Sequence, residues 1–329
     1  MGDVAMSVPV LRAFCKRYPE IKITVLTRGF FKTFFRDLSN ITVYEADVKG
    51  NHKGVLGLYK LSKELRDLDI DAIADLHNVL RSKLLQSLLY PKPCVQIDKG
   101  RAAKKALVAG KRFEQLKTSF QRYADVFEKL GFPFHLGQPE FPPKVELSST
   151  LLLRIGAAKQ GYIGIAPFAA FPGKTYDLKQ MQHVIAQLSK NYKVLLFGGG
   201  KREEELLEVV AGQYENTVNL AGQLTLDEEL DVISNLNCMI AMDSGNAHIA
   251  AMLGVHVITL WGVTHPFAGF YPFYQKLSNA LLADRNKFPR IPTSIYGNKH
   301  PETYEDAINT IRAEDVVKKV MTLAKKSLQ

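Results

Sequence analysis

The feature that most restricts the fold of this chain is a strand, a tight polar turn, a helix and a second strand in direct succession. Residues 238–242 are apolar and end in the sequence Asp-Ser-Gly at 243–245. Residues 247–253 are small and helix-forming, and after a glycine the chain is again apolar over 255–261. This succession predicts a βαβ unit, which requires a parallel sheet with crossover helices.

The turn of this unit is a candidate ligand site. It lies at the carboxyl end of a strand and the amino end of a helix, where open α/β sheets bind ligands and backbone N–H groups favour anions. Asp243 or Ser244 can cap the helix, and Gly245 lets a ligand approach the backbone. His248, one turn further, can point at the same ligand. The residues alone leave two alternatives open, a phosphate site and a plain helix cap followed by a core histidine.

Length and composition indicate a soluble protein of two domains. The chain has 329 residues, of which 46% are hydrophobic, and no apolar run approaches twenty residues. Residues 1–17 lack the basic start and apolar core of a signal peptide. The three cysteines stand in apolar contexts, without the spacing of disulfides or metal sites, which favours a reducing cytoplasm. They are Cys15, Cys94 and Cys238.

The positive charge is concentrated in one half of the chain. Residues 1–150 contain 25 Lys and Arg against 16 Asp and Glu, whereas residues 151–329 contain 18 against 17. This asymmetry favours an anionic partner, such as nucleic acid, a phosphorylated glycolipid or an anionic membrane surface, over general basicity. Aromatic residues do not alternate with the cations of residues 99–112, as a base-stacking platform would require.

The amino-terminal half, predicted as a domain over residues 1–145, alternates strands and helices. This alternation predicts a doubly wound parallel sheet. Gly2 and Asp3 are predicted as a loop that leads into a first helix. Such a loop normally follows a strand, so we expect that an initial strand of about ten residues is missing. The expected strands are 21–26, 41–44, 71–77 and 94–97, and the expected helices are 54–68, 114–130 and one starting near Val79.

The carboxy-terminal half is predicted as a second domain over residues 159–329, after a linker at 146–158. Strands are expected at 162–167, 193–197 and 217–220, helices at 177–190, 225–236 and 313–328, and a loop at 284–301. Lys174 stands between a strand and a helix, where it could neutralise a phosphate or be an ordinary solvated lysine. Gly198, Gly199 and Gly200 permit close approach of a ligand but lack the dinucleotide-binding spacing.

Metal chemistry has little support in the sequence. The Asp-x-Asp strings of residues 67–71 stand before a strand, where a solvated helix end is the better interpretation. His and Cys residues show no zinc-site spacing, and a phosphate-binding GxxxxGK[ST] motif does not occur.

Several motifs, in their order along the chain, resemble glycosyltransferase family 9, the ADP-heptose:lipopolysaccharide heptosyltransferases. The resemblance covers most of the chain, and its most specific part is the Asp-Ser-Gly-x-x-His element. The motifs are Gly2-Asp3-Val4, Asp75-Leu76-His77 with Leu80-Arg81-Ser82, Pro172-Gly173-Lys174-Thr175-Tyr176, Gly198-Gly199, Leu220-Ala221-Gly222 and Asp243 to Ala251.

The resemblance implies a GT-B fold, with two doubly wound Rossmann-like domains facing a cleft. It also implies an inverting, metal-independent transfer of heptose from ADP-heptose to a lipopolysaccharide core acceptor, without a cofactor. Asp3 would be the catalytic base. The donor would be bound by Lys174 at its phosphate, by Asp243, Ser244, Gly245 and His248 at the diphosphate and sugar, by the main chain of Leu224 near the adenine, and by Glu203 or Glu204 at the ribose.

The basic first half fits an acceptor that carries phosphates and sugar carboxylates. Candidate acceptor-binding residues are Arg81, Arg101, Lys104 and Lys105. We expect the protein to act in the cytoplasm, at the inner face of the membrane, and not on nucleic acid. Two alternatives stay open, which are the same fold with another nucleotide sugar and a non-catalytic protein that binds anionic ligands or nucleic acid.

Overall fold

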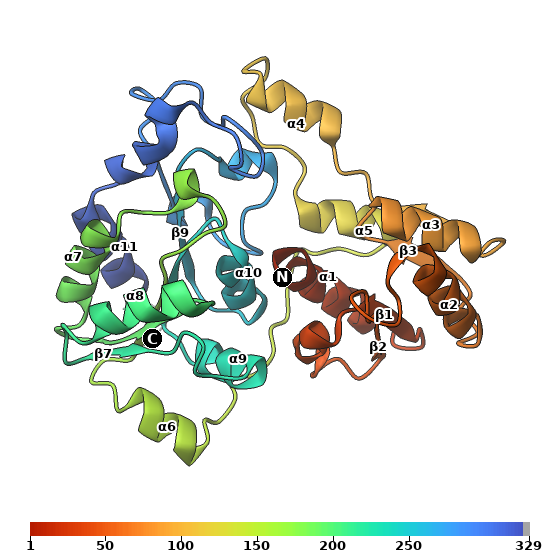
Figure 1. Ribbon diagram of the computed structural model, residues 1–329, viewed down its shortest axis with the longest axis horizontal. Coiled ribbons are helices and arrows are strands. Elements are labelled where there is room, and N and C mark those ends of the chain that lie inside the picture. The colour runs from red at the N-terminus through yellow and green to blue at the C-terminus, as the bar shows by residue number, and fades with distance from the viewer. Residues whose placement is uncertain (325–329) are drawn as a thin grey trace. The chain divides into compact units, whose positions relative to one another are not determined.

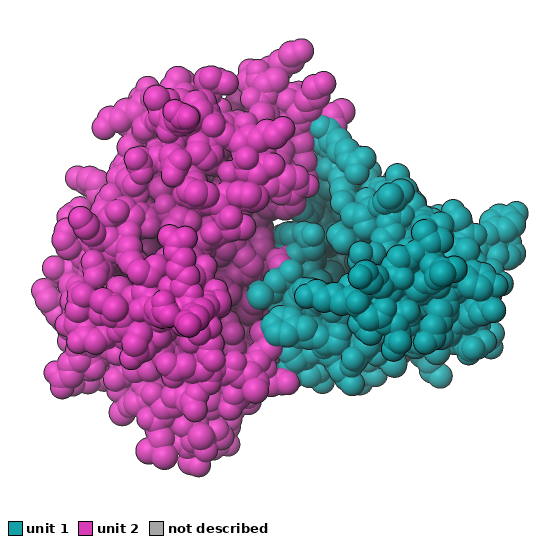
Figure 2. All heavy atoms as spheres, viewed as in Figure 1, with its two compact units in different colours: residues 1, 3–101, 117–140 teal, residues 2, 102–116, 141–329 magenta. Residues whose placement is uncertain are grey.

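The computed structural model describes residues 1–324 and divides into two compact units. The first contains residues 3–101 and 117–140, and the second contains residues 102–116 and the chain from Phe141 on (Figures 1 and 2). Both units are built from parallel strands and helices, so the predicted α/β class is confirmed.

The first unit contains two small parallel sheets, β1 with β2 and β3 with β4. The predicted strands and helices of this half are found, with ends that shift by a few residues. In order, the elements are α1 (Gly2–Arg17), β1 (Ile23–Thr27), η1 (Gly29–Phe35), β2 (Ile41–Glu45), α2 (Gly54–Arg66), β3 (Ile73–Asp75), α3 (Leu80–Leu88), β4 (Cys94–Gln96) and α5 (Ser119–Lys129).

The predicted loop at Gly2 and Asp3 is wrong, because both residues belong to the first turn of α1. The carbonyl of Met1 already accepts hydrogen bonds from the amides of Val4 and Ala5, at 3.1 and 3.0 Å. The apolar stripe of α1 ends at Phe14, whose ring lies 4.6 Å from that of Phe127 in α5. Asp3 is therefore presented by a helix rather than by a free loop, and it is exposed.

The second unit is built around a six-stranded parallel sheet in the order β10-β9-β8-β5-β6-β7. Its elements are α4 (Arg101–Val108), which starts at the unit boundary, α6 (Ser149–Ile155), β5 (Tyr162–Ala166), η2 (Pro172–Lys174), α7 (Leu178–Leu188), β6 (Lys193–Leu196), α8 (Lys201–Ala211), β7 (Thr217–Asn219), α9 (Leu226–Ser234), β8 (Cys238–Met242), α10 (Gly245–Met252), β9 (Val257–Trp261), η3 (Pro266–Ala268), η4 (Leu277–Asn279), β10 (Ala280–Leu282), η5 (Glu302–Thr310) and α11 (Ala313–Ala324).

The strand order reverses at β5. From β5 the chain continues to β6 on one side, and it returns to β8 on the other side, so β5 and β8 are neighbours with Ala166 opposite Ala241. Both β8 and β9 are buried along their whole length, which explains their unbroken apolar sequences. A reversal of this kind leaves a crevice at the carboxyl ends of the two strands, where ligands bind in open α/β sheets.

The boundary between the two units differs from the predicted domain boundary, because residues 102–116 pack with the second unit (Figure 2). Leu107 and Leu116 form a buried cluster with Ala268, next to Phe267 and Phe270. The amide of Leu116 donates to the carbonyl of Phe267 at 2.9 Å. A basic segment that was predicted to belong to the first domain therefore packs with the second unit through its apolar side chains.

Three further differences concern local structure. The predicted linker at 146–158 contains α6, whose first turn is capped by Ser148 at the amide of Leu151. The short edge strand β10 was not predicted, since three residues carry too little periodicity. The predicted final helix is found as α11 up to Ala324, and the rest of that prediction lies outside the described residues.

Leu107 gives a test of how residues 102–116 are held. Replacing this buried side chain by Ala leaves a cavity that costs about 2–5 kcal/mol. We therefore expect Leu107→Ala to accelerate hydrogen exchange of the amides of residues 102–116 by at least about tenfold, while exchange in β8 and β9 stays slow. Leu153→Ala, at a side chain that is 85% exposed, is the matched control. Unchanged exchange in Leu107→Ala would show that the segment is held by other contacts.

Candidate functional site

An ion pair joins the two strands at which the sheet order reverses. Lys174 lies at the end of η2, after β5, and Asp243 directly follows β8. The ammonium of Lys174 lies 2.9 Å from Oδ2 of Asp243, and the two side chains are 12% and 11% exposed. The hydroxyl of Thr264, which follows β9, donates to the same oxygen at 2.9 Å. Three neighbouring strand ends therefore contribute to one charged cluster.

Glycines let the backbone and the stem of Lys174 approach this cluster closely. A Cβ at Gly262 would lie 2.1 Å from the carbonyl oxygen of Gly173, and the Gly173 carbonyl accepts from the amide of Val263 at 3.0 Å. A Cβ at Gly297 would lie 2.3 Å from Cδ of Lys174. The predicted loop at 284–301 thus passes against the lysine stem, and side chains larger than hydrogen would displace it.

The first turn of α10 is left without a side-chain cap. The prediction that Asp243 or Ser244 caps this helix is wrong, because Ser244 is the N-cap residue but makes no cap hydrogen bond. The carboxylate of Asp243 is engaged by Lys174 and Thr264 instead. The hydroxyl of Ser244 is buried and has no hydrogen-bond partner among the described residues. A buried donor and uncapped N–H groups at one helix end are suited to an anionic ligand.

His248 lies on the same helix and is buried, with 7% of its surface exposed. Gly245, at the first position of α10, is half-buried. Both residues therefore belong to the same strand-turn-helix unit as Asp243, as predicted from their spacing.

Two glutamates lie at the start of α8, after β6, the strand next to β5 in the sheet. Glu203, in the first turn of α8, accepts a hydrogen bond from the amide of Gly199 at 2.9 Å. The carboxylate of Glu204 lies against Gly222, where a Cβ would be 2.4 Å from Oε1. Both carboxylates thus border glycine-containing turns at the carboxyl ends of β6 and β7. Leu224 is half-buried in the turn before α9, next to its capping residue.

The predicted acceptor-binding cations have different surroundings. Arg81 is exposed on α3, and Arg101 and Lys105 are exposed on α4. Lys104 is buried, and its ammonium lies 4.0 Å from the centre of the Phe270 ring. Its stem and charge therefore contribute to packing, whereas Arg101 and Lys105 face solvent.

His265 also lies among aromatic side chains. Its ring contacts Phe113 and Phe267, and Arg285 stacks on Phe113 at 3.5 Å. Burial, with a smaller effect of the nearby Arg285, lowers the pKa of His265 to about 4. The histidine is therefore neutral near pH 7, and its Nδ1 accepts from the amide of Phe267 at 3.2 Å.

The sequence placed the loop with Thr264 on this edge of the sheet, but the contacts of Thr264 and Gly297 with the ion pair were not predicted. The role of Thr264 could have been predicted, because β9 is adjacent to β8 and the residues that follow the two strands meet at one sheet edge. Gly297 gave no usable signal, since its contact with Lys174 joins residues more than one hundred positions apart in a segment without regular structure.

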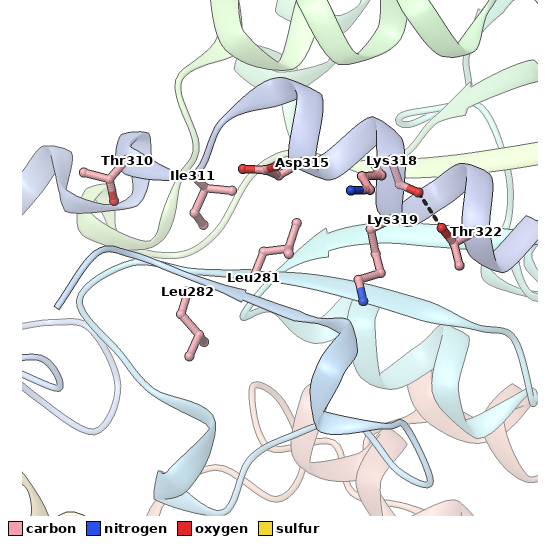
Figure 3. Close-up of a pocket in the computed structure, with 8 residues that line it drawn as sticks. All are labelled: Leu281, Leu282, Thr310, Ile311, Asp315, Lys318, Lys319 and Thr322. Carbon is pink, nitrogen blue, oxygen red and sulfur yellow. Dashed lines mark hydrogen bonds between the residues drawn. The ribbon is translucent and has the colours of Figure 1, made fainter.

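A separate pocket of about 380 Å³ lies between β10 and α11 (Figure 3). Its wall includes Leu281 and Leu282 from the edge strand and Asp315, Lys318 and Lys319 from the helix. None of the predicted donor-site residues lines it. Within residues 1–324, no three His, Cys, Asp or Glu side chains are grouped closely enough to hold a metal ion, and no helix is long and apolar enough to cross a membrane.

Known proteins resemble this chain over most of its length. It is 22% identical to lipooligosaccharide heptosyltransferase 2 of Campylobacter jejuni, over 99% of this chain and 96% of that protein. It is 24% identical to the lipopolysaccharide core heptosyltransferase OpsX of Haemophilus influenzae, over 81% of this chain and 77% of that protein.

Solved structures of low sequence identity have the same fold. A glycosyl transferase family 9 protein from Veillonella parvula superposes with a TM-score of 0.73 at 20% identity, over 99% of this chain and 94% of that one. The Escherichia coli heptosyltransferase WaaC with ADP gives a TM-score of 0.70 at 18% identity, over 98% and 96%. The predicted GT-B architecture with Rossmann-like domains is confirmed by these likenesses.

The sequence profile of glycosyltransferase family 9 (heptosyltransferase) matches residues 58–299, which is more than half of the chain. The matched range includes Lys174 and the turn at Asp243, and it begins after Asp3. This match agrees with the resemblance carried by the ordered motifs. The chain therefore belongs to glycosyltransferase family 9, the heptosyltransferase family, and is a glycosyltransferase.

Proposed function

We propose that this enzyme transfers heptose from ADP-heptose to a lipopolysaccharide core acceptor, with inversion at the sugar and without a metal ion. The observation that carries the donor assignment is the cluster of Lys174, Asp243 and the uncapped α10 turn with the buried Ser244 hydroxyl. The names of the relatives supply the sugar and the acceptor class, since both are described as heptosyltransferases of lipooligosaccharide or lipopolysaccharide.

The donor diphosphate would lie at the start of α10. When the glycosidic bond breaks, the departing ADP gains negative charge that positive groups must stabilise. An ammonium has three donors, and Asp243 engages one of those of Lys174, which leaves two for phosphate oxygens. The N–H groups of α10 and the Ser244 hydroxyl would add neutral donors, and His248 would reach the diphosphate or its sugar.

Asp243 would act as a positioning residue in this arrangement. A carboxylate repels a phosphate, so its direct contact with the donor diphosphate would be unfavourable. Its contact with Lys174 instead fixes the direction of a long and flexible side chain, and Thr264 fixes the carboxylate in turn. The nucleoside would extend toward β6 and β7, with Glu203 or Glu204 at the ribose and the main chain of Leu224 near the adenine.

Asp3 would accept the proton of the acceptor hydroxyl. In the inverting step the acceptor oxygen forms a bond to the anomeric carbon, the bond to ADP breaks on the opposite face, and the hydroxyl proton passes to the carboxylate. Asp3 is exposed at the amino end of α1, so its carboxylate is open to an incoming substrate. No further group is needed to balance this step.

The acceptor would be recognised through its phosphates and sugar carboxylates. Arg81, Arg101 and Lys105 are exposed cations that fit such groups, and Lys104 would act through the packing of α4. A lipid-linked acceptor also places the enzyme at the inner face of the cytoplasmic membrane, which we include in the proposal.

Calorimetry and a transfer assay test this function together. The enzyme should bind ADP and ADP-heptose in the presence of EDTA, and it should transfer heptose to a lipopolysaccharide core acceptor under the same conditions. Transfer from another nucleotide sugar but not from ADP-heptose would change the donor and keep the site. If neither nucleotide binds, the proposed donor site is wrong.

Lys174 should matter mainly in the transition state. We expect Lys174→Ala to lower kcat by about 10²–10³-fold, because a donor to the developing negative charge is lost. Lys179→Ala, at an exposed lysine of the adjacent helix α7, is the matched control and should leave kcat unchanged. Equal rates for the two variants would exclude Lys174 from the chemistry.

Gly297 should matter through Lys174. A methyl group there would collide with the lysine stem, so we expect Gly297→Ala to weaken ADP binding by about tenfold or more, measured by calorimetry. Gly110→Ala is the matched control. Gly110 also has a positive φ, +67° compared with +81° at Gly297, but a Cβ at Gly110 would meet no atom within 4 Å. Comparable losses in both variants would indicate backbone strain rather than displacement of Lys174.

Asp3 is tested by removing its basicity and keeping its shape. We expect Asp3→Asn to lower kcat by about 10²–10⁴-fold, since the amide cannot accept the acceptor proton. The dissociation constant of ADP should stay within about twofold of the parent value, because the donor-site residues are untouched. A variant that keeps full kcat would exclude Asp3 as the base.

A further inference from the structure

Helix α2 exposes apolar side chains on a face that nothing in the described chain covers. Val55, Leu56 and Tyr59 are 66%, 84% and 49% exposed. The opposite face of α2 is buried. Its Leu61 and Leu65 pack against α3, which lies alongside α2 in Figure 1. The exposed apolar residues are therefore not required for the fold of the first unit.

Exposed lysines flank these apolar side chains along the chain. Residues 48–63 contain no Asp or Glu and four lysines, all of them exposed. These lysines are Lys49, Lys53, Lys60 and Lys63. The ammonium of Lys63 lies 4.7 Å from the centre of the Tyr59 ring. We name Val55, Leu56, Tyr59 and these four lysines the α2 face.

The loop that carries Lys49 and Lys53 is fixed to the helix. The amide of Asp47 donates to Nδ1 of His52 at 3.0 Å, and Nε2 of His52 lies 3.0 Å from Glu64. The main chain of His52 also lies against Gly57, where a Cβ would be 2.3 Å from its carbonyl carbon. The first carboxylate after the lysines, that of Glu64, is thus engaged inside the unit, and the loop lysines are held at the helix end.

The lysines at the start of α2 do not stabilise the helix. The amino end of a helix is stabilised by acidic residues, yet α2 has Lys53 as its N-cap residue and no acidic residue in its first turn. Positive charge at this end is unfavourable, because the helix dipole is itself positive there. An anion outside the chain would reverse this effect, because it would lie against both the lysines and the helix amino end.

We propose that the α2 face docks on a bilayer that contains anionic phospholipid. Lysines around an exposed apolar helix face match the combination that binds membrane interfaces, in which apolar side chains enter between headgroups and lysines contact phosphates. A nucleic acid would use the lysines and leave Val55 and Leu56 in water, so the apolar residues favour a bilayer. The inference rests on the proposed function in that a membrane carries the lipid-linked acceptor.

Vesicle sedimentation of the full chain tests the proposal. Binding should be strong with phosphatidylcholine vesicles that contain phosphatidylglycerol and weak with phosphatidylcholine alone. Each lysine removed should lower the partition coefficient about fivefold, so the double variant Lys53→Gln, Lys60→Gln should lose about 25-fold. Its control, Lys190→Gln with Lys201→Gln, removes the same charge from exposed positions of the second unit and should lose less than about twofold.

The apolar contribution has its own matched pair. Leu56→Asn should lower the partition coefficient about tenfold, because a side chain that enters the interface loses its transfer free energy. Leu153→Asn, at a leucine of equal exposure on α6, should not change it. If the two leucine variants bind equally, or if a salt series shows tighter binding to duplex DNA than to the vesicles, the proposal is wrong.

A water-soluble, deacylated acceptor separates this proposal from the proposed function. With that acceptor and ADP-heptose, the α2-face variants should keep the parental rate, since no membrane is involved. Loss of transfer in every variant and in the parent, with intact vesicle binding, would overturn the proposed function and leave the docking face. Normal transfer with vesicle binding that no α2-face variant changes would overturn the docking face alone.

Discussion

The structure of the candidate site depends on the ion pair between Lys174 and Asp243. Each group is nearly buried, and a buried charge without a partner is unfavourable by several kcal/mol, so each residue requires the other. Because β5 and β8 are neighbours at the reversal of strand order, their ends bring the two side chains together. The hydroxyl of Thr264 holds the same carboxylate oxygen, and the main chain at Gly297 passes close against the lysine stem.

This arrangement also explains why the turn at Ser244 is available to a ligand. In many helices an aspartate at this point would accept the first N–H groups and so close the helix end. Here the carboxylate is held by Lys174 on the other side, and the N–H groups of α10 keep their capacity for another acceptor. In the proposed function this helix end would take a phosphate, so the ion pair would link the stability of the sheet edge to the proposed chemistry.

Local sequence patterns predicted most of this architecture, and contacts between distant residues account for what they missed. The apolar run of β8 and the small residues of α10 identified the βαβ unit, because burial on both faces of a parallel strand leaves a clear pattern. The cap at Asp243 was predicted wrongly, since its partners lie in other turns of the sheet. The contribution of Gly297 could not be predicted, because it depends on where an irregular loop passes.

The assignment of residues 102–116 shows the same limit at the level of domains. Periodicity identifies an apolar face, as for Leu107 on α4, but does not say which core that face joins. Lys104 illustrates the consequence for function. Its position in a basic segment led to its prediction as an acceptor-binding residue, and the structure shows that it is buried over Phe270 as part of the packing.

These assignments change the interpretation of the charge asymmetry. Most of the positive excess of residues 1–150 falls in two short segments, residues 48–63 with four lysines and no acidic residue, and residues 102–116 with four cations and one glutamate. The first consists of the loop before α2 and most of α2 in the first unit, and the second packs with the second unit. A nucleic acid attracts cations through its phosphates and has no need of apolar partners. Because the cations of the first segment are mixed with exposed apolar side chains, they suit the proposed membrane contact better than a nucleic acid.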